Sequence, residues 1–128
     1  MVSLDVGADP VPQSYRSDRN VAALRGAAEV VTAAVAAVFM TSISELRTSE
    51  RRSARTAFAR QAAMYLAHVA FGLSYTDVGR AFGRHRTTAA HACRLVEDRR
   101  TDPGLDTQLA SLEHLLRRRC GLNKEVAA

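Results

Sequence analysis

The stretch that decides the fold is Leu73-Ser-Tyr-Thr-Asp-Val-Gly-Arg-Ala-Phe-Gly-Arg-His-Arg-Thr-Thr-Ala-Ala-His-Ala-Cys-Arg94. It predicts two helices joined by a tight turn. Ser74 suits the N-cap of the first helix, and Asp77 suits the positive end of that helix's dipole. Gly83 is expected to end the first helix in the left-handed conformation. The second helix is expected to start near Thr87.

The second helix has one apolar face and one polar, basic face. The apolar residues recur at the spacing i, i+3, i+4, i+7, and they are Ala89, Ala92, Cys93 and Val96. The opposite face carries Arg86, Thr87, Thr88, His91 and Arg94. Such side chains donate hydrogen bonds to base edges and phosphates, as a recognition helix in a major groove requires.

Composition predicts an all-α protein. The 128 residues are 47% hydrophobic but only 5% aromatic, with no Trp, so the core must be built from Ala, Val and Leu. Such a core favours closely packed helices, and we expect a compact bundle of about five to six helices that contains the helix-turn-helix. This domain is expected over residues 17–120, between a disordered tail (1–16) and a frayed C-terminal tail (121–128).

Four further helices are expected around the central pair. They run from Ser17 or Asp18 to about Met40, from Ile43 to Arg47, from about Thr56 to Phe71, and from about Leu105 to Arg119. Asp102-Pro103-Gly104 separates the last helix from the recognition helix, which ends near Arg100, and Gly121 is expected to end the last helix. Fewer than three heptads of leucine argue against an independent coiled coil there.

Positive charge is concentrated in and just before the helix-turn-helix. Residues 47–100 contain eleven arginines and four acidic residues, a net charge of +7, while the whole chain carries +5. Such a local excess points to nucleic acid, although a solvated basic surface is the alternative. Three arginines of the segment before the third helix are candidates for the phosphate backbone or the minor groove: Arg51, Arg52 and Arg55.

Two more candidate phosphate contacts are Arg60 and Gln61. They are expected to face outward near the start of the helix that begins at about Thr56, where free N–H groups help to hold a phosphate. His68, on the same helix, is expected at the surface.

Catalysis and metal binding have little support. The four histidines are scattered, and His91 and Cys93 stand two positions apart, so they point to different helix faces. We therefore expect no enzyme, no metal site and no cofactor. The two cysteines indicate no disulfide framework, and the longest apolar run, Ala27 to Met40, is too short to span a bilayer. These features favour a cytoplasmic, nucleoid-associated protein with no membrane partner.

Several segments resemble a known family. Arg51-Arg52-Ser, Ala59-Arg-Gln-Ala-Ala-Met-Tyr-Leu-Ala, Gly79-Arg-Ala-Phe-Gly-Arg and Thr87-Thr-Ala-Ala-His-Ala-Cys-Arg94 look like the C-terminal DNA-binding domain (domain IV) of DnaA, the bacterial initiator of chromosome replication. The resemblance covers roughly Val21 to Arg119. It implies an all-helical bundle that binds double-stranded DNA.

The resemblance also implies roles for particular residues. Arg52 matches the arginine that the family's basic loop sends into the minor groove, and Arg60 with Gln61 match phosphate contacts. Tyr75 and Thr76 match family residues that contact the DNA backbone. Thr87 and Thr88 match the paired threonines at the head of the family's recognition helix, and the first threonine of that pair contacts bases.

This sequence departs from the family pattern at the turn, Arg84-His85-Arg86, which is one residue shorter. His85 replaces an acid and Arg86 replaces a histidine at two positions that read bases in the family. An arginine reads guanine O6 and N7, so the preference is expected to move toward guanine. The chain also has Ala54 where the family has another arginine, and it contains no G-x-x-x-x-G-K-[ST] phosphate loop, so no ATPase activity of that kind is expected.

Two functions remain open. The first is a small sequence-specific regulator of transcription or of replication initiation, which acts on double-stranded DNA as a monomer or weak homodimer. The second is a protein-interaction module that binds the replication initiator or another replication protein and no longer reads sequence. The sequence does not choose between the transcription and replication roles, nor does it give the recognition sequence.

Overall fold

The computed structural model of the protein describes the backbone of residues 18–47 and 53–127, and side chains within 21–47 and 53–119. Every regular element in these ranges is an α-helix, as expected. The six helices are α2 (Asp18–Val38), α3 (Ile43–Arg47), α4 (Ala54–Phe71), α5 (Tyr75–Phe82), α6 (Arg86–Arg99) and α7 (Pro103–Ala127). The predicted N-terminal tail lies outside the described residues.

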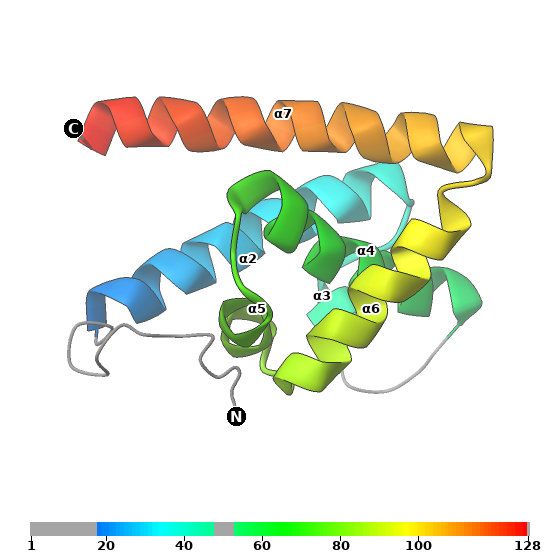
Figure 1. The fold of residues 1–128 in the computed structure, drawn as a ribbon, viewed down its shortest axis with the longest axis horizontal. Helices are drawn as coiled ribbons and strands as arrows, with labels where there is room; N and C mark the ends of the chain where they lie inside the picture. Colours follow the sequence, from blue (N-terminus) through cyan, green and yellow to red (C-terminus); the bar gives the residue numbers. More distant parts are fainter. Residues whose placement is uncertain (1–17, 48–52, 128) are drawn as a thin grey trace.

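Helix α4 is the centre of the bundle and contacts every other described helix (Figure 1). It is rich in alanine, which lets neighbouring helices approach closely. Its buried side chains include Ala59, Ala62, Ala63, Met64, Tyr65, Leu66 and Ala67. Ser53 caps its start by accepting a hydrogen bond from the Thr56 amide (3.1 Å), and Gly72 ends it at φ 72°.

Helix α2 packs on α3, α4, α5 and α7. Leu24, Val31 and Val35 are buried, whereas Val21 is exposed. By length and composition alone, Val21–Phe39 would also suit a membrane span. One side of it nevertheless packs against four other described helices. It ends at Val38, slightly earlier than expected.

The predicted helix-turn-helix is confirmed in its local details. The Ser74 hydroxyl accepts a hydrogen bond from the Asp77 amide (3.1 Å) at the start of α5. Gly83 ends α5 at φ 67°, in the left-handed region that favours glycine. The expected inner stripe of α6 is buried: Ala89, Ala92, Cys93 and Val96. Burial raises the pKa of the Cys93 thiol to about 11, as suits a core residue.

Helix α7 crosses the bundle on the side away from the start of α6 (Figure 1). The Asp102 carboxylate caps it by accepting from the Leu105 amide (2.9 Å), and Pro103 occupies the first helical position. The expectation that Gly121 ends this helix is wrong, because α7 continues to Ala127. A helical glycine costs only about 1 kcal/mol, which neighbouring residues can offset. Leu109, Leu112 and Leu116 of this helix are buried, whereas Leu115 is 58% exposed.

A polar cluster, which we call the Arg100 clasp, joins α7 to α4 and α6. Arg100 Nη1 donates to Glu113 Oε1 (2.6 Å) and to the Tyr65 hydroxyl (2.9 Å), and Arg100 Nε donates to Asp106 Oδ1 (2.5 Å). The Tyr65 hydroxyl donates in turn to Glu97 Oε2 (2.8 Å). Burial alone would lower the pKa of Arg100, but these hydrogen bonds outweigh it and the pKa rises. Arg100 therefore stays charged at any pH the fold withstands.

The Arg100 clasp makes stability depend on pH in the alkaline range. Burial, with the hydrogen bond to Glu97, raises the pKa of Tyr65 from 10.0 to about 12. Between these values the unfolded chain loses its tyrosine proton while the folded chain keeps it, so the free energy of unfolding falls as pH rises. We expect a loss on the order of 2 kcal/mol between pH 10 and 12. Urea unfolding of Tyr65→Phe across that range should show a flatter profile than that of the wild type.

Candidate nucleic-acid interface

The first turn of α6 is held by His85. This residue is the N-cap, and its Nδ1 accepts a hydrogen bond from the Thr87 amide (3.2 Å). The acceptor role leaves no proton on Nδ1, so the Thr87 hydroxyl, 2.8 Å away, donates to the same nitrogen. Thr87 then presents oxygen lone pairs and a methyl group to the outside, and His85 presents Nε2–H. The sequence predicted His85 as a base-contacting residue but not as a cap.

The outer face of α6 is a continuous row of exposed polar side chains, as predicted from its spacing. We call it the α6 face, and it consists of Arg86, Thr87, Thr88, His91 and Arg94. Thr87, His91 and Arg94 lie on the side opposite the buried stripe, and Arg86 is exposed at the first position of the helix. His91 is exposed and Cys93 is buried, so the two do not meet, as the sequence also predicted.

Tyr75 and Thr76 lie in the first turn of α5. The Tyr75 ring is 38% exposed and stacks on the His68 ring at a centroid distance of 4.5 Å and an angle of 28°. His68 Nδ1 lies 2.7 Å from the Leu73 carbonyl oxygen, to which it donates. The prediction of His68 as a plain surface residue is therefore wrong, because the stack half-buries it. His68 orients Tyr75, whose phenol is a possible donor to a phosphate.

The two arginines of α4 differ in exposure and in their hydrogen bonds. Arg55 is exposed, with Nη1 donating weakly to the Met40 carbonyl oxygen (3.4 Å). Arg60 is half-buried and donates from Nε to the Leu46 carbonyl (3.3 Å) and from Nη2 to the Glu45 carbonyl (3.3 Å). Arg51 and Arg52, the remaining basic-loop candidates, lie outside the described residues.

Arg60 and Gln61 were expected to face outward beside free helix N–H groups, and that expectation is wrong. Ser53 starts α4 at Ala54, so both residues lie beyond the first turn, whose N–H groups alone lack helical partners. Gln61 is half-buried. Any phosphate contact by Arg60 depends on its guanidinium and not on the helix end.

An arginine-lined cleft of about 270 Å³ lies beside the turn that leads into α6. We call it the arginine cleft, and its charged lining residues are Arg25, Glu29, Arg47, Arg60 and Arg84. No functional role was predicted for Arg25 or Glu29 from the sequence. The available signal was an opposite-charge pair four positions apart on a helix made mostly of alanine and valine.

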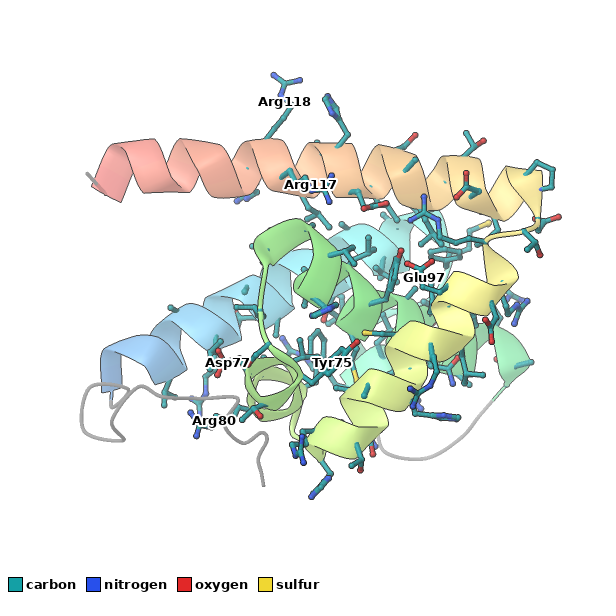
Figure 2. The ribbon with its side chains drawn as sticks, in the orientation of Figure 1. Tyr75, Asp77, Arg80, Glu97, Arg117 and Arg118 are labelled. Carbon is teal, nitrogen blue, oxygen red and sulfur yellow. The ribbon has the colours of Figure 1, made fainter. Side chains whose placement is uncertain are left out.

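Helix α5 and the start of α6 lie at the edge of the molecule opposite α7 (Figure 1). Figure 2 shows Arg80, on α5, at the edge opposite α7, and Arg118 pointing outward from α7. Figure 2 shows the acidic Glu97 toward the end of α6 that lies nearer α7.

A capped helix pair with an exposed polar row on its second helix defines a helix-turn-helix protein of the all-α class. Residues 28–96, more than half of the chain, match the family described as "Bacterial dnaA protein helix-turn-helix", and the chain belongs to this family. DNA binding related to replication initiation is what membership of that family implies.

Individual relatives agree with the family match. The chromosomal replication initiator protein DnaA of Sphingopyxis alaskensis is 34% identical over 117 residues, which cover 90% of this chain and 25% of that protein. DnaA of Nitrosomonas eutropha is 44% identical over 71 residues, covering 54% of this chain and 16% of that protein. The chain thus spans at most a quarter of the length of these two relatives.

A solved structure shows the same fold. The replication initiator DnaA bound to AMPPCP and single-stranded DNA superposes with a TM-score of 0.68 and 25% sequence identity. The match covers 80% of this chain and 31% of that one.

Proposed function

We propose that the protein binds double-stranded DNA sequence-specifically and acts as a small regulator of transcription or of replication initiation. The observation that carries the proposal is the α6 face, an exposed row of five hydrogen-bonding side chains on a helix whose other side is buried. A helix of this kind fits the major groove, which is about 12 Å wide. The proposed site of action is the nucleoid, in the cytoplasm.

The proposed DNA contacts are of two kinds: contacts to bases, which read the sequence, and contacts to the DNA backbone, which position the protein. Arg86 and Thr87 lie at the head of α6 and read bases, whereas Tyr75, Thr76 and Arg55 contact the backbone. Arg51 and Arg52 are proposed to lie in the adjacent minor groove. The 128 residues contain no phosphate-loop motif, so we propose that this function needs no ATP hydrolysis.

A binding titration against genomic fragments at several salt concentrations tests the proposal. With about five or six phosphate contacts, the logarithm of affinity should fall with the logarithm of salt at a slope near −0.9 per contact. A subset of fragments should bind more tightly than random DNA of equal length. If no fragment exceeds random DNA, sequence-specific reading is wrong, and the protein-interaction alternative replaces it.

Thr87→Ala is expected to cost about 1–3 kcal/mol on the preferred sequence and little on random DNA. The substitution removes the hydroxyl and methyl group of Thr87 from the exposed surface. It leaves the Thr87 amide, whose N–H donates to His85 Nδ1. The ratio of the two affinities is the measurement. Thr107→Ala, on the exposed side of α7, is the matched control and should leave that ratio unchanged. An equal loss on both kinds of DNA would make Thr87 a backbone contact.

A further inference from the structure

The arginine cleft gathers charge from four separate parts of the chain. Arg25 comes from α2, Arg47 from α3, Arg60 from α4 and Arg84 from the turn before α6, together with the single carboxylate of Glu29. The formal charge of these five groups is +3. Like charges repel, so a fold that lines one cavity with four arginines favours an anion there.

We propose that the arginine cleft seats a backbone phosphate of the DNA duplex, with Arg25 of α2 and Arg47 of α3 as contact residues. This inference rests on the proposed function, because the same duplex must lie on the α6 face. It adds α2 and α3 to an interface that the sequence confined to the basic loop, α4, α5 and α6.

The position of the cleft relative to α6 fits a phosphate of the same groove. Arg84 lines the cleft and stands three positions before Thr87, so their Cα atoms are at most about 11 Å apart. A helix that enters the major groove has a phosphate strand on each side, within the groove's width of about 12 Å. A cavity beside the head of α6 therefore lies where one strand passes.

The cleft is held in shape before any ligand arrives. Arg60 is fixed by the last carbonyl groups of α3, so its guanidinium ties α3 to α4 at the wall of the cavity. The turn that carries Arg84 is fixed as well, because the Arg84 amide donates to the Gly79 carbonyl (2.8 Å). A pre-formed set of donors binds with a smaller loss of side-chain entropy.

The size and lining of the cleft favour one charged group over a whole small molecule. Small-molecule sites are usually cavities of about 300–1,000 Å³ with mainly apolar walls. This cleft is smaller, and charged side chains supply much of its wall. Guanidinium groups also match phosphate geometry, since each can donate two parallel hydrogen bonds.

Glu29 gives the proposal a test with the opposite sign. Glu29 lines the cleft, and its negative charge opposes an incoming phosphate. Replacing Arg25 or Arg47 should weaken binding, and Glu29→Gln should tighten it. A role of these residues in folding alone would not produce that pair of effects.

The experiment compares Arg25→Gln, Arg47→Gln and Glu29→Gln with Arg118→Gln, an exposed arginine of α7 that carries the same charge change. Affinities are measured by titration over a salt series, on the preferred duplex and on a random duplex. Each cleft arginine variant should lose about tenfold on both duplexes, with the salt slope reduced by about 0.9. Glu29→Gln should gain severalfold, and Arg118→Gln should match the wild type.

Three results would overturn the inference, and they are distinguishable. If the wild type binds the preferred duplex but the cleft variants behave like Arg118→Gln, the cleft assignment alone is wrong. If those variants keep wild-type affinity while millimolar inorganic phosphate raises the melting temperature of the wild type but not of Arg25→Gln, the cleft takes free phosphate instead of DNA. If the wild type binds no duplex, the proposed function fails and the cleft assignment fails with it.

Discussion

Gly79→Ala is expected to lower the free energy of unfolding by about 2–4 kcal/mol and to weaken binding of the preferred duplex by about a hundredfold. A Cβ at this position would lie 2.5 Å from the Arg84 carbonyl oxygen, 3.2 Å from the Arg86 nitrogen and 3.3 Å from the His85 carbonyl carbon. All three are backbone atoms of the turn, so no side-chain rotation relieves the contact. Either α5 or the turn must move, and the turn sets the direction of α6.

The measurements are thermal unfolding and a DNA titration at a temperature where the variant is folded. For a domain of this size the expected destabilisation corresponds to a fall in melting temperature of roughly 10–15 °C. Gly26→Ala, in the interior of α2, is the matched control because nothing lies within 4 Å of its added Cβ. It should raise stability by about 0.5–1 kcal/mol and leave DNA binding unchanged. A Gly79→Ala protein with wild-type stability and affinity would show that the turn is not packed tightly on α5.

The sequence predicted the features that depend on near neighbours in the chain. The caps at Ser74 and Gly83 join atoms a few residues apart, and the buried stripe of α6 follows from helical spacing. The same local rules predicted α3 at its observed bounds, Ile43–Arg47. The family resemblance then identified the DNA-binding class, which the family match confirmed.

Features that depend on distant parts of the chain were not predicted. Arg60 looked like an outward phosphate contact because spacing places it on the polar side of α4, but α3 offers it two carbonyl groups from fourteen and fifteen residues away. His68 is half-buried because Tyr75, on the next helix, covers its ring. The arginine cleft likewise requires knowing that α2, α3 and the α5–α6 turn meet. Periodicity gives the inward side of a helix but not which neighbour covers it.

The Gly121 error has a different cause. Glycine marks a helix end when the chain must reverse direction there, as at Gly72 and Gly83, both of which have positive φ. At Gly121 the helix continues instead, and residue type alone does not distinguish the two situations. After Gly72 and after Gly83 another helix starts within a few residues, so the reversal is required by the packing of the next element.

Arg100→Ala is the second substitution with a large expected effect, a loss of about 3 kcal/mol in the free energy of unfolding. The Arg100 side chain is 18% exposed and that of Glu113 is 14% exposed, so the pair is largely removed from water. Without the guanidinium, the Glu113 carboxylate and the Tyr65 hydroxyl lose a charged partner while they stay buried. Urea unfolding measures the effect, and Arg118→Ala should stay within about 0.5 kcal/mol of the wild type.

The loss of stability in Arg100→Ala should come mainly from the buried Glu113 carboxylate, which loses its partner. A double variant can show this. Arg100→Met combined with Glu113→Leu removes both charges and fills the space with apolar groups, which often restores or exceeds the stability of a buried ion pair. The double variant should therefore be more stable than Arg100→Met alone. Asp106 is 48% exposed, so water can solvate its carboxylate when Arg100 is absent. Losing the Arg100–Asp106 ion pair should therefore change the free energy of unfolding little. If the double variant is as unstable as the single one, the Arg100 clasp holds α7 through the arginine's own packing on Tyr65, whose ring centroid lies 5.9 Å from the guanidinium carbon.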